Sequence, residues 1–324
     1  MRAIQIQKIG GPEVLSLKDM AMPSVGAADV LVQMEATGVN YLDIYQRSGT
    51  YPVPLPFIPG VEAVGVVREV GPCVESFRSG DRVAWILIPG AYAEYTVVPE
   101  HRLIPVPRGL PVNTATAILF QGVTAWLWTT AVYPIRAGHH VLVHAAGTGV
   151  GRLLVQMSRA HGAHVFGTAS NDEKATAATT AGANETALTT SPNLVSVVKD
   201  WTHGDGVDVV FDGVGGPTWE TSLSVVKMRG TLVSFGQSGG PLPCLEIPVL
   251  GNRGSLTLIR PIMAHYLLTV QDLRMAAAAV FDGVMANRWS PLIERAYPLD
   301  QASEAHRRLE SGDARGKLLL VPSV

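Results

Sequence analysis

A turn built from small residues carries the clearest chemical signal in the chain. Residues 144–151 read HAAGTGVG and follow directly on the apolar run 141–143. Apolar residues with helical spacing follow over 152–162, and a second apolar, β-branched run covers 164–170. This order predicts a βαβ unit that binds a dinucleotide. A glycine-rich turn lets the backbone approach a pyrophosphate, and the helix start presents free N–H groups and a positive dipole end.

The turn departs from the pattern G-x-G-x-x-G. Ala146 and Thr148 occupy the first two glycine positions, Gly151 occupies the third, and Gly149 is an additional glycine. We expect Thr148, Gly149 and Val150 to bind the cofactor, with the Thr148 hydroxyl either pointing away from the phosphate or bonding it. The alternative is an ordinary glycine-rich loop. The strands and the helix around the turn favour the dinucleotide site.

The end of the second strand selects the cofactor. An acidic residue there would bind a ribose 2′-hydroxyl and favour NAD. Here the strand ends in Ala169-Ser170-Asn171, and Ser170 and Lys174 supply a hydroxyl and a cation for a 2′-phosphate. Asp172 is the counter-argument, which we interpret as the acidic start of the next helix. These residues predict NADPH; the alternative for Lys174 is a solvated lysine on the helix surface.

Length and composition exclude several classes of protein. The chain has 324 residues, 47% of them hydrophobic and 16% charged, which is enough for two domains and excludes extensive disorder. A formal net charge of −2 without a basic block argues against nucleic acid as a partner. We expect no apolar run long enough to span a membrane, no signal peptide and a cytoplasmic setting. Cys73 and Cys244 are too few for a disulfide framework or a four-cysteine zinc site, and we expect them to be packing residues.

The pattern of elements divides the chain. Short strands and Gly/Pro turns over 1–110 predict a barrel-like antiparallel domain. Strands and helices alternate from 137 to 261, which predicts a doubly wound parallel sheet, after two helices over about 113–119 and 122–130. Val214, Phe235 and Gly236 follow strands of that sheet, where its ligands are expected. A terminal helix and the strand 317–321 are expected to return to the first domain.

Several motifs together resemble the zinc-independent NADPH:quinone oxidoreductases of the medium-chain dehydrogenase/reductase superfamily. The resemblance extends over nearly the full length. It rests on segments 38–45 (GVNYLDIY), 59–65 (PGVEAVG), 80–83 (GDRV), 121–125 (QGVTA), 144–151 (HAAGTGVG), 212–215 (DGVG), 234–236 (SFG) and 260–261 (RP).

The resemblance implies an α/β fold of two domains. A GroES-like β-rich catalytic domain is implied at 1–120 and 262–324, around a Rossmann doubly wound parallel-sheet domain at 121–261. NADPH and a homodimer are implied as well. Relatives often have a tyrosine near the adenine where this chain has Leu188-Thr189-Thr190, so the resemblance does not supply the adenine contacts.

The same comparison predicts that no metal is bound. Zinc alcohol dehydrogenases of the superfamily have a cysteine ligand near the position of Asn40 and a histidine at that of Val61. The nine histidines form no cluster with a cysteine at ligand spacing, and catalytic zinc needs about three protein ligands. Alcohol oxidation would lack its Lewis acid. A quinone or an α,β-unsaturated carbonyl, in contrast, accepts hydride without a metal.

The resemblance also implies roles for individual residues. Asn40 is expected beside the nicotinamide ribose or carboxamide, and Tyr45 and Tyr51 are candidate hydrogen-bond donors to the substrate; Tyr51 resembles the proton-donor tyrosine of related enoyl reductases. Either tyrosine could instead be an aromatic wall residue, with water supplying the proton. The remaining cofactor-binding residues that the resemblance implies are Thr124, Phe235, Gly236, Arg260 and Lys317.

Three functions therefore stand side by side. The first is quinone reduction by NADPH. The second is NADPH-dependent reduction of an enone, an enal or an enoyl thioester on the same scaffold. The third is a non-catalytic NADPH-binding or RNA-associating protein, and the near-neutral charge argues against the RNA association.

Overall fold

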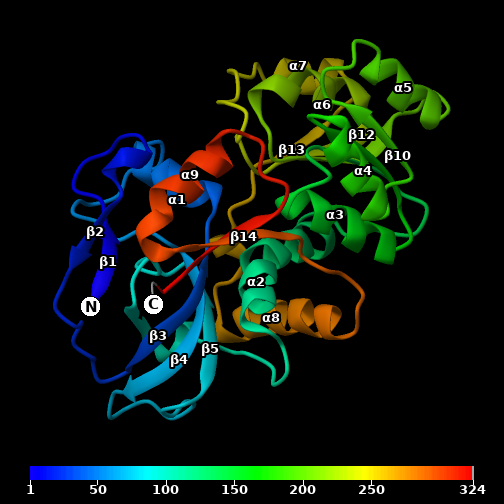
Figure 1. Ribbon diagram of the computed structural model, residues 1–324. Coiled ribbons are helices and arrows are strands. Elements are labelled where there is room, and N and C mark those ends of the chain that lie inside the picture. The colour runs from blue at the N-terminus through cyan, green and yellow to red at the C-terminus, as the bar shows by residue number, and fades with distance from the viewer. Residues whose placement is uncertain (323–324) are drawn as a thin grey trace. The chain divides into compact units, whose positions relative to one another are not determined.

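The structure is a computed structural model that describes residues 1–322, and the chain forms two compact units (Figure 1). The first unit comprises Met1–Phe120, Thr269–Met285 and the C-terminal segment from Pro291. The second comprises Gln121–Leu268 and Ala286–Ser290. Residues 262–268 thus lie in the second unit, beyond the domain boundary placed at 262 from the sequence.

The second unit contains a parallel six-stranded sheet with the order β10-β9-β8-β11-β12-β13. Counted along the chain, this is the order 3-2-1-4-5-6 of doubly wound dinucleotide-binding folds, so the predicted fold class is confirmed. The strands are β8 (His140–Val143), β9 (His164–Ala169), β10 (Glu185–Leu188), β11 (Val207–Asp212), β12 (Val226–Ser234) and β13 (Thr257–Ile259).

A row of apolar side chains explains how one face of this sheet is covered. Leu142, Phe166, Val210 and Leu232 are register partners on neighbouring strands and belong to one buried cluster. Side chains of α5 and α6 complete that cluster. Helices α3 and α4 pack against β8, β9 and β10. The helices of the unit are α3 (Gly149–Ala160), α4 (Asp172–Thr180), α5 (Leu194–Trp201), α6 (Trp219–Val225) and α7 (Pro248–Asn252).

Helix α2 (Val112–Leu127) is one continuous helix, where the sequence predicted two. It passes through Gly122, which is buried, so burial outweighs the low helix propensity of glycine. The π-helical segment Trp128–Val132 extends it. The combined helix is long and apolar enough to cross a membrane, contrary to our expectation that no such run exists, but 67% of its apolar window is buried inside the protein, as in a core helix.

The first unit is built around the long strand β3 (Asp29–Gly38). Its sheet has the order β14-β15-β3-β4-β5-β7, and β6 also pairs with β3. The C-terminal strand β15 is antiparallel to β3, which confirms that the chain end returns to the N-terminal domain. The other strands of this sheet are β4 (Glu62–Val70), β5 (Arg82–Ile86), β6 (Tyr95–Pro99), β7 (Ile104–Pro105), β14 (Ile293–Pro298) and β15 (Lys317–Val321). Strands β1 (Arg2–Gln5) and β2 (Ser16–Asp19) pair with each other in a separate two-stranded sheet.

Three helices accompany this sheet: α1 (Tyr41–Ser48), α8 (Val270–Met285) and α9 (Ala302–Glu310). Side chains from β3, β4 and β15 form its core together with Ala302 and Ala305 of α9. Cys73, in this unit, and Cys244, in the second, are both exposed free thiols. The expectation that they are packing residues was wrong.

Candidate functional site

The glycine-rich turn has the close packing that a phosphate-binding turn requires. Thr148 is the N-cap of α3, and Gly149 is the first residue of the helix. A Cβ on Gly151 would lie 2.2 Å from the carbonyl oxygen of Ala145, so only glycine lets α3 begin this close to the end of β8. A Cβ on Gly147 would lie 2.1 Å from the backbone oxygen of Lys174.

The start of α3 offers the donors that a pyrophosphate needs. The first N–H groups of a helix have no intrahelical acceptor, and here they belong to Gly149, Val150 and Gly151. Thr148, Gly149 and Val150 are only partly buried, so a ligand can reach them. The donor set and the absence of side-chain bulk fit an anionic dinucleotide.

Two further candidate residues, Ser170 and Lys174, lie just after the end of β9. Ser170 is exposed, and Asn171 caps α4 by accepting a hydrogen bond from the Lys174 backbone N–H at 2.9 Å. Asp172 is the first residue of α4, in agreement with its interpretation as a helix start. Lys174 is only 8% exposed, so the alternative of a solvated surface lysine is wrong.

Further candidate residues lie at the carboxyl ends of β11 and β12. Val214, Phe235 and Gly236 are partly buried in the loops that follow these strands. Arg260 follows β13, and its Nη1 donates to the carbonyl oxygens of Gly236 at 2.8 Å and Ser234 at 3.2 Å. The guanidinium is therefore held beside the loop after β12. Thr124 lies on α2 and is 5% exposed.

A buried polar network supports the loop after β11. Asp212 Oδ1 accepts hydrogen bonds from the N–H groups of Val214 at 2.8 Å and Gly215 at 3.0 Å. Asp212 Oδ2 accepts one from the Ser222 hydroxyl at 2.7 Å. The Ser222 oxygen in turn lies 3.1 Å from Nε2 of His144, a histidine whose pKa is lowered by burial.

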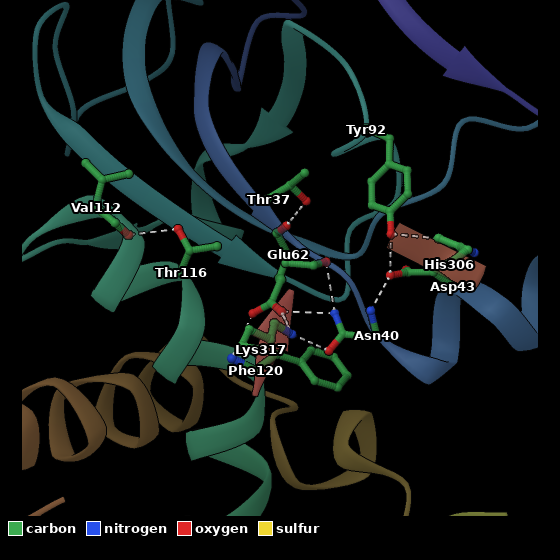
Figure 2. Close-up of polar contacts among 11 residues, drawn as sticks. Thr37, Asn40, Asp43, Glu62, Tyr92, Val112, Thr116, Phe120, His306 and Lys317 are labelled. Carbon is green, nitrogen blue, oxygen red and sulfur yellow. Dashed lines mark hydrogen bonds and ion pairs between the residues drawn. The ribbon is translucent and has the colours of Figure 1, made fainter. Parts of the chain in front are cut away.

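In the first unit, strand register brings three polar side chains together (Figure 2). Leu319 pairs with Gly38, and Thr37 pairs with Ala63, so Lys317 and Glu62 both lie near Asn40. Lys317 Nζ donates to Asn40 Oδ1 at 2.7 Å and to Glu62 Oε1. Asn40 Nδ2 donates to Glu62 Oε1 at 2.9 Å and to the Gly38 carbonyl at 3.2 Å.

A second buried network of hydrogen bonds begins at the backbone of Asn40, whose N–H donates to Asp43 Oδ2 at 2.8 Å. The Tyr92 hydroxyl donates to the same oxygen at 3.1 Å and lies 3.0 Å from His306 Nε2 (Figure 2). Nδ1 of His306 lies 3.2 Å from Arg47 Nη1. Arginine can only donate, so Nδ1 must accept and Nε2 must carry the proton. Each hydrogen bond of this network is thus donated in the direction of Asp43.

Burial shifts the pKa values along this network. Desolvation raises the pKa of Asp43 to about 7, although the Asn40 N–H and the charge of Lys317 act in the opposite direction. Desolvation and the Arg47 cation lower the pKa of His306 to about 3. The pKa of Tyr92 is raised well above its ordinary value by burial and by the Asp43 charge. At neutral pH the imidazole and the phenol are therefore both uncharged.

The two tyrosines named as donor candidates lie side by side. The rings of Tyr45, on α1, and Tyr51 are 5.1 Å apart between centroids and tilted by 59°. The Tyr51 N–H donates to the Tyr45 carbonyl at 2.9 Å. Tyr51 is 40% exposed, so its ring is accessible to a small molecule.

Metal ligands do not gather in this region. Within residues 1–322, no group of three His, Cys, Asp or Glu side chains is arranged to hold a metal ion. Asn40 is occupied by its hydrogen bonds to Glu62 and Lys317, and Val61 is 3% exposed.

Sequence reasoning missed the residues that support the site. Glu62, Asp43 and Asp212 lie inside motifs that the sequence singled out, yet they were given no role. Their one signal is a carboxylate inside an apolar segment, because a buried carboxylate needs partners. Their partners lie elsewhere in the sequence: Lys317 is 255 residues from Glu62, and Tyr92 is 49 residues from Asp43.

Comparison with known families and proteins agrees with this geometry. The family described as "Alcohol dehydrogenase GroES-like domain" matches residues 26–108, and "Zinc-binding dehydrogenase" matches residues 149–278. A quinone oxidoreductase of Pseudomonas aeruginosa is 38% identical over 99% of this chain and 99% of its own length. A 2-haloacrylate reductase of Burkholderia sp is 34% identical over 99% of this chain and 98% of its own.

Among solved structures, the Escherichia coli quinone oxidoreductase complexed with NADPH superimposes with a TM-score of 0.97. It shares 34% sequence identity, and the match covers 99% of this chain and 100% of that one. A fold match of this extent, with this identity, includes both compact units of the chain.

Proposed function

The chain belongs to the quinone oxidoreductase family of the medium-chain dehydrogenase/reductase superfamily, and we propose that it reduces quinones with NADPH. The observation that carries the proposal is the pair of features at β8 and β9. A close-packed glycine turn opens a helix, and Ser170 and Lys174 replace the acidic residue that would favour NAD. When bound, NADPH supplies the hydride, and a quinone needs one further proton to become a hydroquinone.

In the second unit, the proposed cofactor-binding residues divide by chemistry. The N–H groups of Gly149 and Val150, with the Thr148 hydroxyl, bind the pyrophosphate, because helix starts stabilise anions. Ser170 and Lys174 bind the 2′-phosphate. Thr124, Val214, Phe235 and Gly236 border the nicotinamide nucleoside, and Arg260 lies near a phosphate or a ribose of the cofactor.

In the first unit, Asn40 is proposed to hold the nicotinamide nucleoside through its side chain, and Lys317 contributes through its contact with Asn40. Tyr45 and Tyr51 flank the acceptor and donate a hydrogen bond to its developing oxyanion. In a quinone the product anion is delocalised, so water can supply the proton. We therefore expect neither tyrosine to be obligatory for quinone reduction.

The assay that tests this function follows NADPH oxidation with 1,4-benzoquinone, 9,10-phenanthrenequinone and a simple enone in parallel. An NADH control and an enzyme-free blank accompany each acceptor. We expect turnover of the quinones with NADPH preferred. Quinone turnover that prefers NADH would contradict the cofactor assignment, and no quinone turnover despite NADPH binding would contradict the reaction.

Likeness to a 2-haloacrylate reductase favours one alternative, reduction of an activated alkene. A carbanion formed from an alkene needs a proton at carbon, so a tyrosine donor matters more there than for quinones. Tyr51→Phe should then lower enone turnover about 10²-fold or more while leaving quinone turnover near wild type. Tyr95→Phe, on β6 of the same unit and outside the proposed site, is the matched control. Equal losses for both acceptors would remove the proton-donor role.

Metal-free chemistry is part of the same proposal. Its support is the identity of the residues near Asn40, where Val61 and the Asn40 carboxamide replace zinc ligands. Activity should survive dialysis against a strong chelator. If the chelator inhibits the enzyme and added zinc restores the activity, the metal-free mechanism is wrong.

The assembly, domain division and location are proposed as well. We place the GroES-like domain at 1–120 and 262–324, except for residues 262–268 and 286–290, which belong to the same compact unit as the Rossmann domain at 121–261. We propose that the protein is a cytoplasmic homodimer without a nucleic-acid or membrane partner. Strand β13 lies at an edge of its sheet, and Met228 and Ile247 of the same unit are 74% and 78% exposed, which suits an interface. Two exposed free thiols suit a reducing compartment. Light scattering should give about twice the 34.4 kDa chain mass.

A further inference from the structure

The buried pair Glu62 and Lys317 has a consequence for Asn40. We propose that this pair orients the Asn40 carboxamide so that its oxygen, and not its nitrogen, is the atom presented to the cofactor. Glu62 and Lys317 are then positioning residues, and Asn40 is a hydrogen-bond acceptor for a donor on the nicotinamide nucleoside. The inference rests on the proposed role of Asn40 in binding NADPH.

The orientation of the carboxamide follows from the chemistry of its neighbours. A lysine ammonium can only donate, so the atom 2.7 Å from Lys317 Nζ must be the Asn40 oxygen. The Gly38 carbonyl only accepts, so the atom 3.2 Å from it must be the nitrogen. A rotation of the amide by 180° would place donor against donor and acceptor against acceptor.

The bonding capacity of Asn40 is then nearly used up. Both N–H bonds of Nδ2 have acceptors, the Glu62 carboxylate at 2.9 Å and the Gly38 carbonyl. The oxygen has two lone pairs, and Lys317 takes one of them. The side chain also faces the Asp43 N–H in a capping box, but no hydrogen bond forms there, so one acceptor position is left. It matches a ribose hydroxyl or a carboxamide NH₂, which are donors on the nicotinamide nucleoside.

The pair itself has no freedom to turn. The side chains of Glu62 and Lys317 are both fully buried. The second carboxylate oxygen of Glu62 accepts a hydrogen bond from the Phe120 N–H at 3.0 Å (Figure 2). A Cβ on Gly38 would lie 2.1 Å from Glu62 Oε1 and 2.6 Å from Lys317 Cε. The glycine that precedes Val39 and Asn40 is therefore required by the ion pair.

The test is a double-mutant cycle on NADPH affinity, with the dissociation constant measured by nucleotide fluorescence. Wild type, Lys317→Met, Asn40→Ala and the double variant are compared. We expect each single variant to bind NADPH about tenfold more weakly, which corresponds to one hydrogen bond. The double variant should bind no more weakly than Asn40→Ala, because Lys317 acts through Asn40. The inference would be overturned if the loss of NADPH affinity in the double variant equalled the product of the two single losses. It would also be overturned if either single variant bound NADPH as tightly as wild type.

Loss of a buried cation can also unfold the protein, so a second variant is needed. Glu62→Gln keeps the shape of the side chain, but the Phe120 N–H requires its oxygen, which leaves its NH₂ facing the donors of Lys317 and Asn40. It should weaken NADPH binding as Lys317→Met does while circular dichroism shows a folded protein. The control is Glu35→Gln, which removes the exposed Glu35–Arg82 pair of the same unit and should leave the affinity unchanged. A folded Glu62→Gln protein with wild-type affinity would contradict the inference.

The donor on the cofactor is identified with the reduced 3-acetylpyridine analogue of NADPH, which lacks the carboxamide NH₂. If the analogue binds wild type more weakly than NADPH does, and Asn40→Ala abolishes that difference, the carboxamide is the donor. If the difference is unchanged in Asn40→Ala, while that variant binds both nucleotides more weakly, the donor is a ribose hydroxyl. These measurements need no turnover. If the NADPH affinities of the variants are as expected but the wild-type protein reduces no quinone, the proposed reaction is refuted and the positioning role remains supported.

Discussion

Asp212 Oδ1 accepts a hydrogen bond from the backbone N–H of Val214 at 2.8 Å. Through this bond, a fully buried carboxylate shapes the loop that follows β11. The other oxygen of Asp212 accepts from Ser222, so the Ser222 proton is not available to His144. His144 Nε2 must therefore donate to Ser222, and its Nδ1 accepts from Thr168 at 2.7 Å. As in the network that ends at Asp43, the hydrogen bonds converge on a carboxylate that holds backbone N–H groups.

Replacing Asp212 should loosen the Val214 loop. Asp212→Ala leaves the N–H groups of Val214 and Gly215 without their acceptor, which should cost about 3 kcal/mol of unfolding free energy and weaken NADPH binding. Asp212→Asn should cost much less. Its oxygen can serve the two N–H groups, and its NH₂ can donate to Ser222, which reverses the hydrogen bonds at His144. Urea unfolding and nucleotide fluorescence measure both effects; equal losses for the two variants would argue against this role of the carboxylate.

The start of α3 should not tolerate a side chain at Gly151. A Cβ there would meet the Ala145 carbonyl at 2.2 Å, and a backbone atom cannot rotate away. Gly151→Ala should therefore displace the helix start, lower the melting temperature by several degrees and weaken NADPH binding. Gly251→Ala, in α7 of the same unit, is the control, because its Cβ would have no atom within 4 Å. If both variants behave like wild type, the packing argument fails.

The sequence was sufficient for the fold of the second unit and, apart from helix α2, which carries Thr124, for the elements that hold its candidate residues. The signals there are local, since strand, turn, helix and strand follow one another within residues 141–170. The buried contacts that hold Asn40 in the first unit were not predictable in the same way. Lys317 was expected to bind the cofactor, and its burial between Asn40 and Glu62 depends on the pairing of β15 with β3. No pattern within one segment records a pairing between strands so far apart.

Lys174 provides the sharpest test of cofactor choice. Lys174→Ala removes a cation in the first turn of α4, and a hydrogen bond to a charged group contributes about 1.5–3 kcal/mol. NADPH binding should weaken about tenfold or more, and NADH binding should change little, because NADH has no 2′-phosphate. The ratio of the two dissociation constants is the relevant readout, since a general disturbance of α4 would cancel in it. A ratio equal to that of wild type would remove the 2′-phosphate role.

Asp43 and His306 should make opposite contributions to stability as the pH changes. Folded Asp43 keeps its proton up to about pH 7, whereas an unfolded aspartate loses it near about pH 4, so its contribution to the unfolding free energy falls as the pH rises between these values. Folded His306 stays neutral down to about pH 3, whereas an unfolded histidine gains a proton below about pH 6.5, so its contribution falls as the pH drops. In wild type the two slopes offset each other. Urea unfolding at several pH values between about 4.5 and 6.5 should show stability that rises with pH in Asp43→Asn and falls with pH in His306→Gln. Parallel profiles of the two variants would show that these groups do not titrate as their burial requires.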